Sequence, residues 1–310
     1  MRLNKKFTIN KYINMKCCWR SPTVVNHNED NILDISLVNE KYLDFDIKNY
    51  PHSFLGEGHY GKCYKITLNE KEYTCKKIKY LKNNKFKREI NILKNLKKND
   101  YLPEFFISFS NLESHYILYN YIPGNDLFQC LKNGYFELHN KNKLLKVIAQ
   151  INDGLFELFN NNLVHLDIKL ENIILTNKDP IKIKIIDLES CHKINNKKNT
   201  FCGTPGYASP EMILQNKHYY NTDIWSLGII LFMLYTHDNF FYKDITSYDD
   251  FNWLEFFEKF DNIYIKNRLI ESNSYDKDVY ELLTLMLHKL HIYRISIHGL
   301  KKHKLLQIQN

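Results

Sequence analysis

An aspartate, a lysine and an asparagine lie close together in the segment LVHLDIKLENII, residues 163–174, between short apolar runs. Asp167 could accept or orient the proton of a substrate hydroxyl, and Lys169 could neutralise a phosphoryl group during its transfer. Asn172 could bind Mg²⁺, a hard cation that takes oxygen ligands. Asp187, at the end of the next apolar run, supplies the carboxylate that such a metal needs. These residues predict a site for metal-assisted phosphoryl transfer.

A glycine-rich motif, GEGHYG at residues 56–61, has the form GxGxxG. By itself this motif fits an ordinary turn, a dinucleotide-binding loop or a loop that covers nucleotide phosphates. A dinucleotide site requires a helix after the glycines, whereas an alternating, strand-like run follows here. The order therefore favours a hairpin loop over ATP phosphates, where Gly56, Gly58 and Gly61 let backbone N–H groups come close.

A lysine in the next strand-like run, YTCKKI at residues 73–78, could hold the same phosphates. Lys76 and Lys77 are both candidates, and a solvated surface charge is the alternative for each in a lysine-rich chain. The position relative to the glycine motif and to the following helix favours Lys76. A flexible lysine needs a carboxylate to fix it, and Glu89 on that helix could supply one.

The pattern of apolar residues predicts that these groups lie on elements of two kinds. Strand-like runs at 62–68 and 72–78 suggest a hairpin, and apolar residues at helical spacing follow at 86–96. Two more strand-like runs (105–109 and 116–121) precede a turn at 123–126. The rest is mainly helical, at 144–159, 221–235, 253–260 and 279–290, with β-like pieces at 163–165, 173–175 and 181–186. We expect a β-rich lobe with one helix, followed by a helical lobe.

With three further motifs the chain resembles the eukaryotic protein kinases over roughly residues 53–305. CGTPGYASPE at 202–211 resembles the end of a kinase activation segment, and DIWSLG at 223–228 resembles the start of the buried helix behind it. Arg294 matches the arginine that pairs with the activation-segment glutamate, here Glu211. Lys169, two residues after Asp167, and Thr204, in the motif GTPGY, resemble the residues that serine/threonine kinases, rather than tyrosine kinases, have at these positions.

The resemblance implies an α+β, bilobal protein-kinase-like fold and ATP-dependent transfer of the γ-phosphoryl group to serine and threonine hydroxyls of protein substrates, with autophosphorylation. It implies ATP and Mg²⁺ or Mn²⁺ as cofactors. Catalytic roles fall on Asp167, Lys169, Lys76 and Glu89, and metal ligation falls on Asn172 and Asp187. The nucleotide-binding residues that it implies are Leu55, Gly56, Gly58, Gly61, Cys63, Thr74, Lys76, Tyr119, Tyr121, Ile122, Asp126 and Ile174. Leu93, His165 and Leu188 are expected to stack in a regulatory hydrophobic column, with Phe105 as its strand member.

The sequence departs from the family pattern at two positions near the site. Leu166 stands where the family has an arginine that receives a phosphate on the activation loop, and leucine offers no such contact. Thr200 matches the usual site of that phosphate. Glu189 replaces the glycine after Asp187 and Leu188, which places another negative charge near the metal. The alternative to an active kinase is a pseudokinase or scaffold binding module, but the lysine, both aspartates and the asparagine of the site are all present.

Composition limits the class of protein. The 310 residues are 44% hydrophobic and 25% charged, as in soluble globular proteins. Lysines are spread along the chain, so the net charge of +8 does not predict a nucleic-acid partner. Seven cysteines without regular spacing predict reduced thiols. The longest apolar stretch, residues 227–235, is too short to span a membrane. We expect a monomer in the cytoplasm, with a nuclear location also open.

The domain organisation follows from where the pattern sharpens along the chain. Residues 1–49 are polar and asparagine-rich, and we expect an N-terminal extension there with one short helix near 32–38. Residues 50–310 form the expected kinase domain, with an N-lobe of about 50–120 and a C-lobe of about 121–310.

Overall fold

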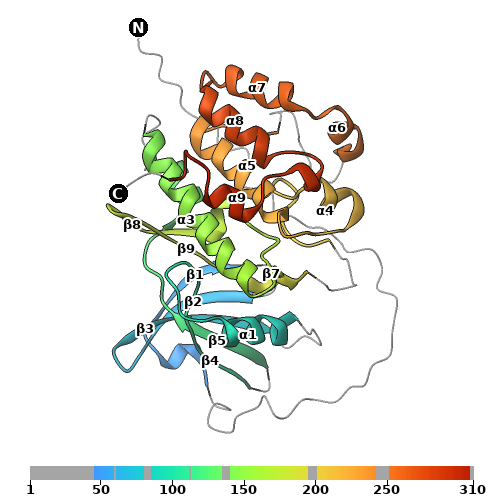
Figure 1. The fold of residues 1–310 in the computed structure, drawn as a ribbon. Coiled ribbons are helices and arrows are strands. Elements are labelled where there is room, and N and C mark those ends of the chain that lie inside the picture. Colours follow the sequence, from blue (N-terminus) through green and yellow to red (C-terminus); the bar gives the residue numbers. More distant parts are fainter. Residues whose placement is uncertain are drawn as a thin grey trace.

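The first part of the described chain forms an antiparallel sheet of five strands (Figure 1). The computed structural model describes residues 45–58, 61–79, 85–111, 113–134, 140–194, 201–241 and 251–307. The strands are β1 (His52–Glu57), β2 (Gly61–Leu68), β3 (Lys71–Lys79), β4 (Phe105–Ser110) and β5 (Ser114–Asn120), in the order β1-β2-β3-β5-β4. Asn69 and Glu70, both with positive φ, form the two-residue turn between β2 and β3, as the favoured hairpin turns require. The predicted hairpin is therefore confirmed.

Alternation of side chains gives this sheet two different faces. One face carries an apolar cluster that the 3-10 helix η4 (Ile47–Asn49) helps to close. The buried members of this cluster are Phe45, Ile47, Ile66, Tyr73, Cys75, Phe109, Tyr116 and Leu118. The opposite face carries Lys76 together with Ile78, Ile117 and Tyr119, which belong to the main core. The alternation of side chains along the strands thus gives the sheet an apolar outer face and an inner face that carries polar groups.

Helix α1 (Lys85–Asn95) packs against the second face of the sheet. Phe86, Ile90 and Leu93 recur at helical spacing and are all buried. Glu89 lies three residues after Phe86, so it projects from the same stripe and is buried as well. The apolar residues that anchor α1 therefore also carry a carboxylate toward strand β3.

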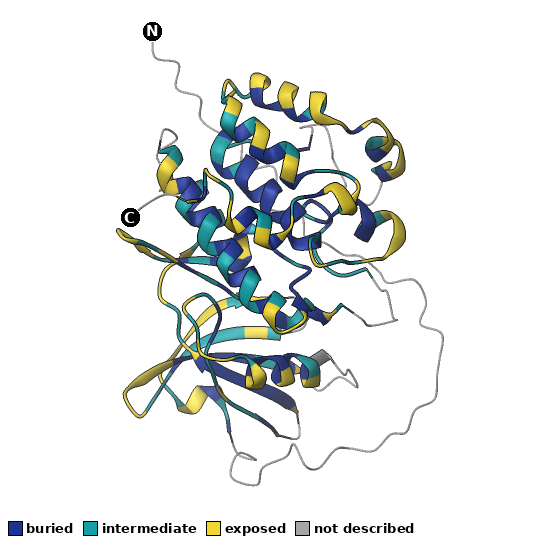
Figure 2. Ribbon diagram, viewed as in Figure 1, coloured by how far each residue is buried: buried dark blue, intermediate teal, exposed yellow. Residues whose placement is uncertain are grey.

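The second lobe is mainly helical (Figure 1). Its helices are α2 (Leu127–Lys132), α3 (Lys141–Asn160), α4 (Pro210–Gln215), α5 (Thr222–Thr236), α6 (Trp253–Lys259), α7 (Asn262–Glu271), α8 (Lys277–Met286) and α9 (Ile297–Lys301). Helix α5 is apolar on nearly all sides, as expected for a helix in the centre of a core, and it is buried from residue 222 to 232. Figure 2 shows the buried residues inside this lobe, while α7 presents exposed residues outward.

Short strands and 3-10 turns connect the helices of this lobe, and most of them lie between α3 and α4. Strands β6 (Asn125–Asp126), β8 (Ile173–Lys178) and β9 (Ile181–Ile185) form a three-stranded sheet. Strands β7 (Leu163–Val164) and β10 (His192–Lys193) form a two-stranded one. The 3-10 turns η5 (Leu170–Asn172) and η6 (Leu188–Ser190) directly follow Lys169 and Asp187, and a third, η7 (His291–Tyr293), precedes α9. Every predicted site residue after the sheet of the first lobe, except Tyr121 and Ile122, lies on or beside these short elements.

The prediction of an α+β chain with a β-rich lobe and a helical lobe is confirmed. The helix predicted to reach residue 290 ends at Met286 instead, because residues 287–293 turn toward η7. Helices α2, α4, α7 and α9 and strand β1 were not predicted. They are short or carry mixed polar residues whose periodicity is weak. The short helix expected near 32–38 lies outside the described residues.

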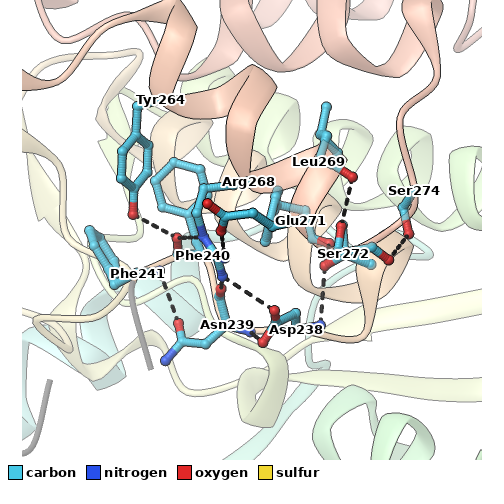
Figure 3. A network of polar contacts seen from close by, with 12 residues as sticks. Asp238, Asn239, Phe240, Phe241, Tyr264, Arg268, Leu269, Glu271, Ser272 and Ser274 are labelled. Atoms are coloured by element: carbon cyan, nitrogen blue, oxygen red, sulfur yellow. Dashed lines mark hydrogen bonds and ion pairs between the residues drawn. The ribbon is translucent and has the colours of Figure 1, made fainter. Parts of the chain in front are cut away.

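A buried arginine fixes the chain after α5 (Figure 3). The side chain of Arg268 on α7 is 3% exposed and donates through Nε to the carbonyl of Phe240 at 3.1 Å. It also pairs with Glu271 at 2.7 Å and with Asp238 at 3.3 Å. The hydroxyl of Tyr264 donates to the same carbonyl at 3.0 Å. The backbone groups of this loop are thus satisfied by side chains, as buried polar groups must be.

Among the described residues, no helix has both the length and the apolar content needed to span a bilayer.

The five described cysteines, Cys63, Cys75, Cys130, Cys191 and Cys202, all have free thiols.

A second buried ion pair joins α4 to the chain before α9. Arg294 Nη1 lies 2.7 Å from Glu211 Oε1, and Nη2 lies 2.9 Å from Oε2. The hydroxyl of Thr222, at the start of α5, donates to the same Oε1 at 2.9 Å. Burial would raise the pKa of Glu211, but the hydrogen bonds and charge of Arg294 outweigh burial and lower it. This two-bond pair between guanidinium and carboxylate ties three distant segments together.

We predict that Glu211→Gln lowers the free energy of unfolding by about 3 to 5 kcal/mol, because it leaves the Arg294 charge buried without a counterion. The pKa of Glu211 is below its usual value of 4.5, so its contribution is complete above pH 4.5 and declines as the pH falls further. Urea unfolding at pH 7 and pH 4 measures both effects. Glu255→Gln is the control. The pair of Glu255 with Lys259 is exposed, so this substitution should leave the free energy of unfolding almost unchanged. Equal effects of both substitutions would contradict this assignment.

Candidate active site

Lys76 lies where three acidic side chains meet. Its Nζ is 3.0 Å from Oε1 and 3.0 Å from Oε2 of Glu89 on α1. The same atom is 3.0 Å from Oδ1 of Asp187 and 3.0 Å from Oε2 of Glu189, just before and within η6. The lysine side chain is 8% exposed and that of Glu89 is 3% exposed. One ammonium group therefore joins strand β3, helix α1 and the 187–190 segment.

The two lysines that the sequence offered lie on opposite faces of the sheet. Neighbouring residues of a strand point to opposite sides, and Lys77 lies over the ring of Tyr116, 5.7 Å from its centroid. Tyr116 belongs to the outer apolar cluster. The structure thus places Lys76, and not Lys77, beside Glu89.

Burial and charge act against each other at this cluster. Burial would lower the pKa of Lys76, but Asp187, Glu89 and Glu189 together raise it well above its ordinary value. Burial raises the pKa of Glu89 to about 7, against the pull of Lys76 and with a further push from Asp187. Burial would also raise the pKa of Asp187, yet Lys76 lowers it on balance. Lys76 therefore stays positively charged, and its ammonium group is the common partner of Glu89, Asp187 and Glu189.

Asp167 and Lys169 form a compact triangle with Thr204. Lys169 Nζ lies 2.9 Å from Asp167 Oδ2 and donates to the Thr204 hydroxyl at 3.1 Å. That hydroxyl donates to Asp167 Oδ1 at 2.8 Å. Burial would lower the pKa of Lys169, but Asp167, together with Glu171 and Asp187, raises it on balance. A carboxylate held on both oxygens in this way is oriented to receive a proton from a group placed beside it.

The backbone before Asp167 is strained and is held by a buried aspartate. Leu166 has φ 67°, a left-handed conformation that is uncommon for a residue with a side chain and costs energy. The N–H groups of His165 and Leu166 donate to Oδ2 and Oδ1 of Asp223 at 2.7 and 2.8 Å. Gly203, at φ 94°, lies so close to the Leu166 carbonyl that a Cβ there would be 2.2 Å from its oxygen. Asp223 and Gly203 therefore fix the strained turn that presents Asp167.

Asn172 and Asp187 come from neighbouring backbones. The side-chain amide of Asn172 donates to the Asp167 carbonyl at 2.8 Å, which leaves its own side-chain oxygen to accept or to bind a cation. The Ile186 N–H donates to the Asn172 carbonyl at 2.8 Å, so the next residue, Asp187, lies close to Asn172. Among the described residues, no group of three or more His, Cys, Asp and Glu side chains could hold a metal ion by itself. One carboxylate and one amide oxygen do fit Mg²⁺, which is commonly held by few protein ligands together with substrate phosphates.

The glycine motif leaves room beside β1 and β2. Among the described residues, a Cβ at Gly56 would meet no atom within 4 Å, and one at Gly58 would meet only the Gly61 carbonyl oxygen at 3.8 Å. A Cβ at Gly61 would lie 2.5 Å from the Lys77 carbonyl oxygen. Close strand pairing thus requires Gly61, whereas the space at Gly56 and Gly58 is open to an approaching ligand. Residues 59 and 60 lie outside the described residues.

Three other predicted nucleotide residues share the Lys76 face. Cys63 pairs with Lys76 across β2 and β3, and Thr74 pairs with Tyr119 across β3 and β5. Directly opposite residues of an antiparallel pair project to the same side. Burial raises the pKa of Cys63 to about 11, and its side chain is hydrogen-bonded to Tyr119. The cysteine is therefore a neutral thiol beside Tyr119.

The remaining predicted nucleotide residues flank this face. Leu55, on β1, is largely exposed, and Tyr121 and Ile122 are half-buried just beyond β5. Asp126 pairs with Ile174 across β6 and β8. The Asp126 carboxylate accepts the Gln129 N–H at 2.7 Å and caps α2, so this side chain has a structural task in addition to the predicted one.

Most of the residues predicted for the regulatory hydrophobic column lie in or against the main hydrophobic core. Leu93, His165 and Leu188 are all buried, and Leu93 and Leu188 belong to the main hydrophobic cluster. Phe105 packs against the same cluster while partly buried. The Nε2 atom of His165 lies 3.2 Å from the Ile186 carbonyl oxygen, which links the loop of Asp167 to the segment of Asp187.

Leu166 fills an apolar environment in place of a phosphate-binding arginine. It is buried in a small cluster with Val164, Ala208 and Met212. Leucine thus contributes packing where the family has a charge. Thr200, the predicted phosphorylation site, lies outside the described residues.

Sequence reasoning missed three supporting residues. Asp223 is predicted only as the start of a helix and Thr204 only as a mark of acceptor type, and no role in holding residue 189 is predicted for Arg88. Arg88 donates through Nη2 to the Glu189 carbonyl at 2.9 Å, and its Nη1 lies 2.7 Å from His192 Nε2. The available signal was weak, because an acid at a helix start and a basic residue on a helix are common on solvated surfaces.

Comparison with known proteins agrees with this geometry. The sequence profile of the family described as "Protein kinase domain" matches residues 51–306. An Aurora kinase of Yarrowia lipolytica is 31% identical over 186 residues, which cover 57% of this chain and 49% of that protein. The serine/threonine-protein kinase polo of Drosophila melanogaster is 31% identical over 198 residues, covering 58% and 32%. Human serine/threonine-protein kinase Nek5 is 34% identical over 193 residues, covering 59% and 27%.

The matched segments thus make up about half, or less, of these relatives. The family match nevertheless includes both lobes and every predicted catalytic and metal-binding residue. The chain therefore belongs to the eukaryotic protein kinase family.

Proposed function

We propose that this chain transfers the γ-phosphoryl group of ATP to serine and threonine hydroxyls of protein substrates, with Mg²⁺ as the cofactor. The observation that carries the proposal is the position of Lys76, whose Nζ lies 3.0 Å from both Glu89 and Asp187. This contact joins the sheet of the first lobe to the segment that adjoins Asn172. The groups that could bind phosphate, hold a metal ion and accept a hydroxyl proton therefore lie on adjoining segments, as phosphoryl transfer requires.

Each residue would act through ordinary chemistry of its group. Lys76 would position phosphate oxygens with its positive charge, while Glu89 keeps the lysine directed inward. Asp187 and Asn172 would hold the metal, which when bound supplies positive charge against the phosphates. Asp167 would accept the proton of the substrate hydroxyl, and Lys169 would stabilise negative charge on the transferred group. Thr204 would keep Asp167 in its orientation.

The alternative function is that of a pseudokinase, a binding module without phosphoryl transfer. Glu189, which adds a third acid to Lys76, is the specific observation that favours this alternative. The chain nevertheless has all of the predicted catalytic and metal-binding residues, and we therefore favour the active enzyme.

We predict that the purified full chain transfers label from γ-labelled ATP to a generic protein substrate, and that phosphoamino-acid analysis finds phosphoserine and phosphothreonine. Asp187→Asn should lower the rate about a thousandfold through loss of the metal ligand. The reaction without added substrate tests the proposed autophosphorylation. A wild-type chain that binds ATP but transfers no label would favour the pseudokinase, and mainly phosphotyrosine would contradict the acceptor type.

We predict that Lys76→Met also lowers the rate of transfer about a thousandfold, because the phosphate oxygens lose their charged partner. Lys77→Met is the matched control, since Lys77 lies on the opposite face over Tyr116 and should keep most of the activity. Steady-state rates with both proteins, checked for folding by circular dichroism, decide the comparison. Loss of activity in Lys77→Met alone would reverse the assignment of the two lysines.

We predict that Thr204→Val lowers kcat about tenfold to a hundredfold, because Asp167 loses the hydroxyl that orients its carboxylate. Thr204→Ser keeps the hydroxyl and should keep most of the rate. The KM for ATP should change little in either variant, because Thr204 has no contact with the Lys76 cluster. Equal losses in both variants would show that the methyl group, not the hydroxyl, matters.

A further inference from the structure

Glu189 contributes a carboxylate to Lys76 that the site does not need for its proposed chemistry. Its Oε2 lies 3.0 Å from Lys76 Nζ, and its side chain is 12% exposed. Residue 189 is where the family has a glycine, which has no side chain to reach the lysine. The contact is therefore a property of this chain that the resemblance to the family does not imply.

The ammonium group of Lys76 has no donor left over for another anion. A lysine ammonium carries three N–H donors. Four oxygens from three carboxylates, those of Glu89, Asp187 and Glu189, lie 3.0 Å from its nitrogen. A phosphate oxygen that binds Lys76 must therefore take the place of one of them.

Glu189 is the carboxylate whose departure disturbs least. Glu89 is 3% exposed, places both oxygens on the lysine and projects from the buried face of α1. Asp187 is the proposed metal ligand, and its place beside Lys76 is part of the same site. Glu189 uses one oxygen and a side chain with three rotatable bonds, so its carboxylate can swing aside.

The backbone at residue 189 is fixed independently of that side chain. Its carbonyl accepts from Arg88 Nη2 at 2.9 Å, a bond that any residue at this position could make. Residue 189 lies in the 3-10 turn η6 and is not among the residues with positive φ. A change of side chain at 189 therefore removes the carboxylate without demanding a new backbone conformation.

We propose that the Glu189 carboxylate occupies the phosphate-binding donor of Lys76 in the nucleotide-free protein, so that Glu189 and the phosphates of ATP compete for one ammonium group. This inference rests on the proposed function, because it assumes that ATP binds at Lys76. The competition weakens the binding of ATP and leaves the binding of the adenosine part unchanged. Glu189 is thus a specificity-determining residue for the phosphate portion of the nucleotide.

The test is a measurement of dissociation constants by isothermal titration calorimetry on the full chain, without any assay of activity. ATP and adenosine are titrated into the wild type, Glu189→Gln and Glu189→Asp, each with and without Mg²⁺. Glu189→Gln removes the charge, and Glu189→Asp keeps the charge but shortens the side chain by one methylene. Glu113→Gln, which removes an exposed negative charge elsewhere on the same lobe, is the control for net charge.

We expect both Glu189 variants to bind ATP about tenfold more tightly than the wild type, since a charge-assisted contact to Lys76 no longer competes. Adenosine should bind all proteins equally, and Glu113→Gln should match the wild type. Thermal unfolding without nucleotide shows that each variant is folded.

Four results would overturn the inference. ATP affinities within twofold of the wild type in both Glu189 variants would show that no competition exists. A gain in Glu189→Gln but not in Glu189→Asp would reduce the effect to net charge. Weaker ATP binding that appears only with Mg²⁺ would assign Glu189 to the metal instead. A wild type that binds neither ATP nor adenosine would contradict the proposed function itself, and the inference with it.

Discussion

The ammonium group of Lys76 is the point on which the arrangement of the site depends. It is nearly inaccessible to water and is surrounded by carboxylates from α1 and from the 187–190 segment. A buried charge is tolerated only when it is paired and hydrogen-bonded. These contacts hold strand β3, α1 and the 187–190 segment together, because separation of β3 from both acidic segments would leave the Lys76 charge uncompensated inside the protein.

The second lobe holds the opposite half of the site by a similar use of buried polar groups. Asp223, fully enclosed at the start of α5, accepts two consecutive N–H groups from the turn that presents Asp167. This bond pattern stabilises a left-handed leucine that would otherwise be unfavourable. The apolar core around α5 thus also supports the turn that orients Asp167, the predicted catalytic carboxylate.

The two departures from the family pattern change the chemistry of neighbouring regions in different ways. Leu166 replaces a charge with packing, since it lies among Val164, Ala208 and Met212. Glu189, by contrast, adds a negative charge, and its carboxylate forms an ion pair with Lys76. Both residues keep the local backbone of the fold, because the carbonyl of residue 189 is held by Arg88 and Leu166 is held by Asp223.

The sequence alone predicted the order of the two lobes, their longer elements and the candidate reactive groups, because apolar periodicity and the local spacing of Asp167, Lys169 and Asn172 are properties of neighbouring residues. It also favoured Lys76 over Lys77, although only the register of β3 places Lys77 over Tyr116. Tertiary structure alone decided the contacts between segments distant in sequence. Asp223 with the turn at 165 and 166, Thr204 with Asp167, and Glu189 with Lys76 are such contacts. No local pattern encodes them, since they arise only when packing of the core brings the segments to within hydrogen-bond distance.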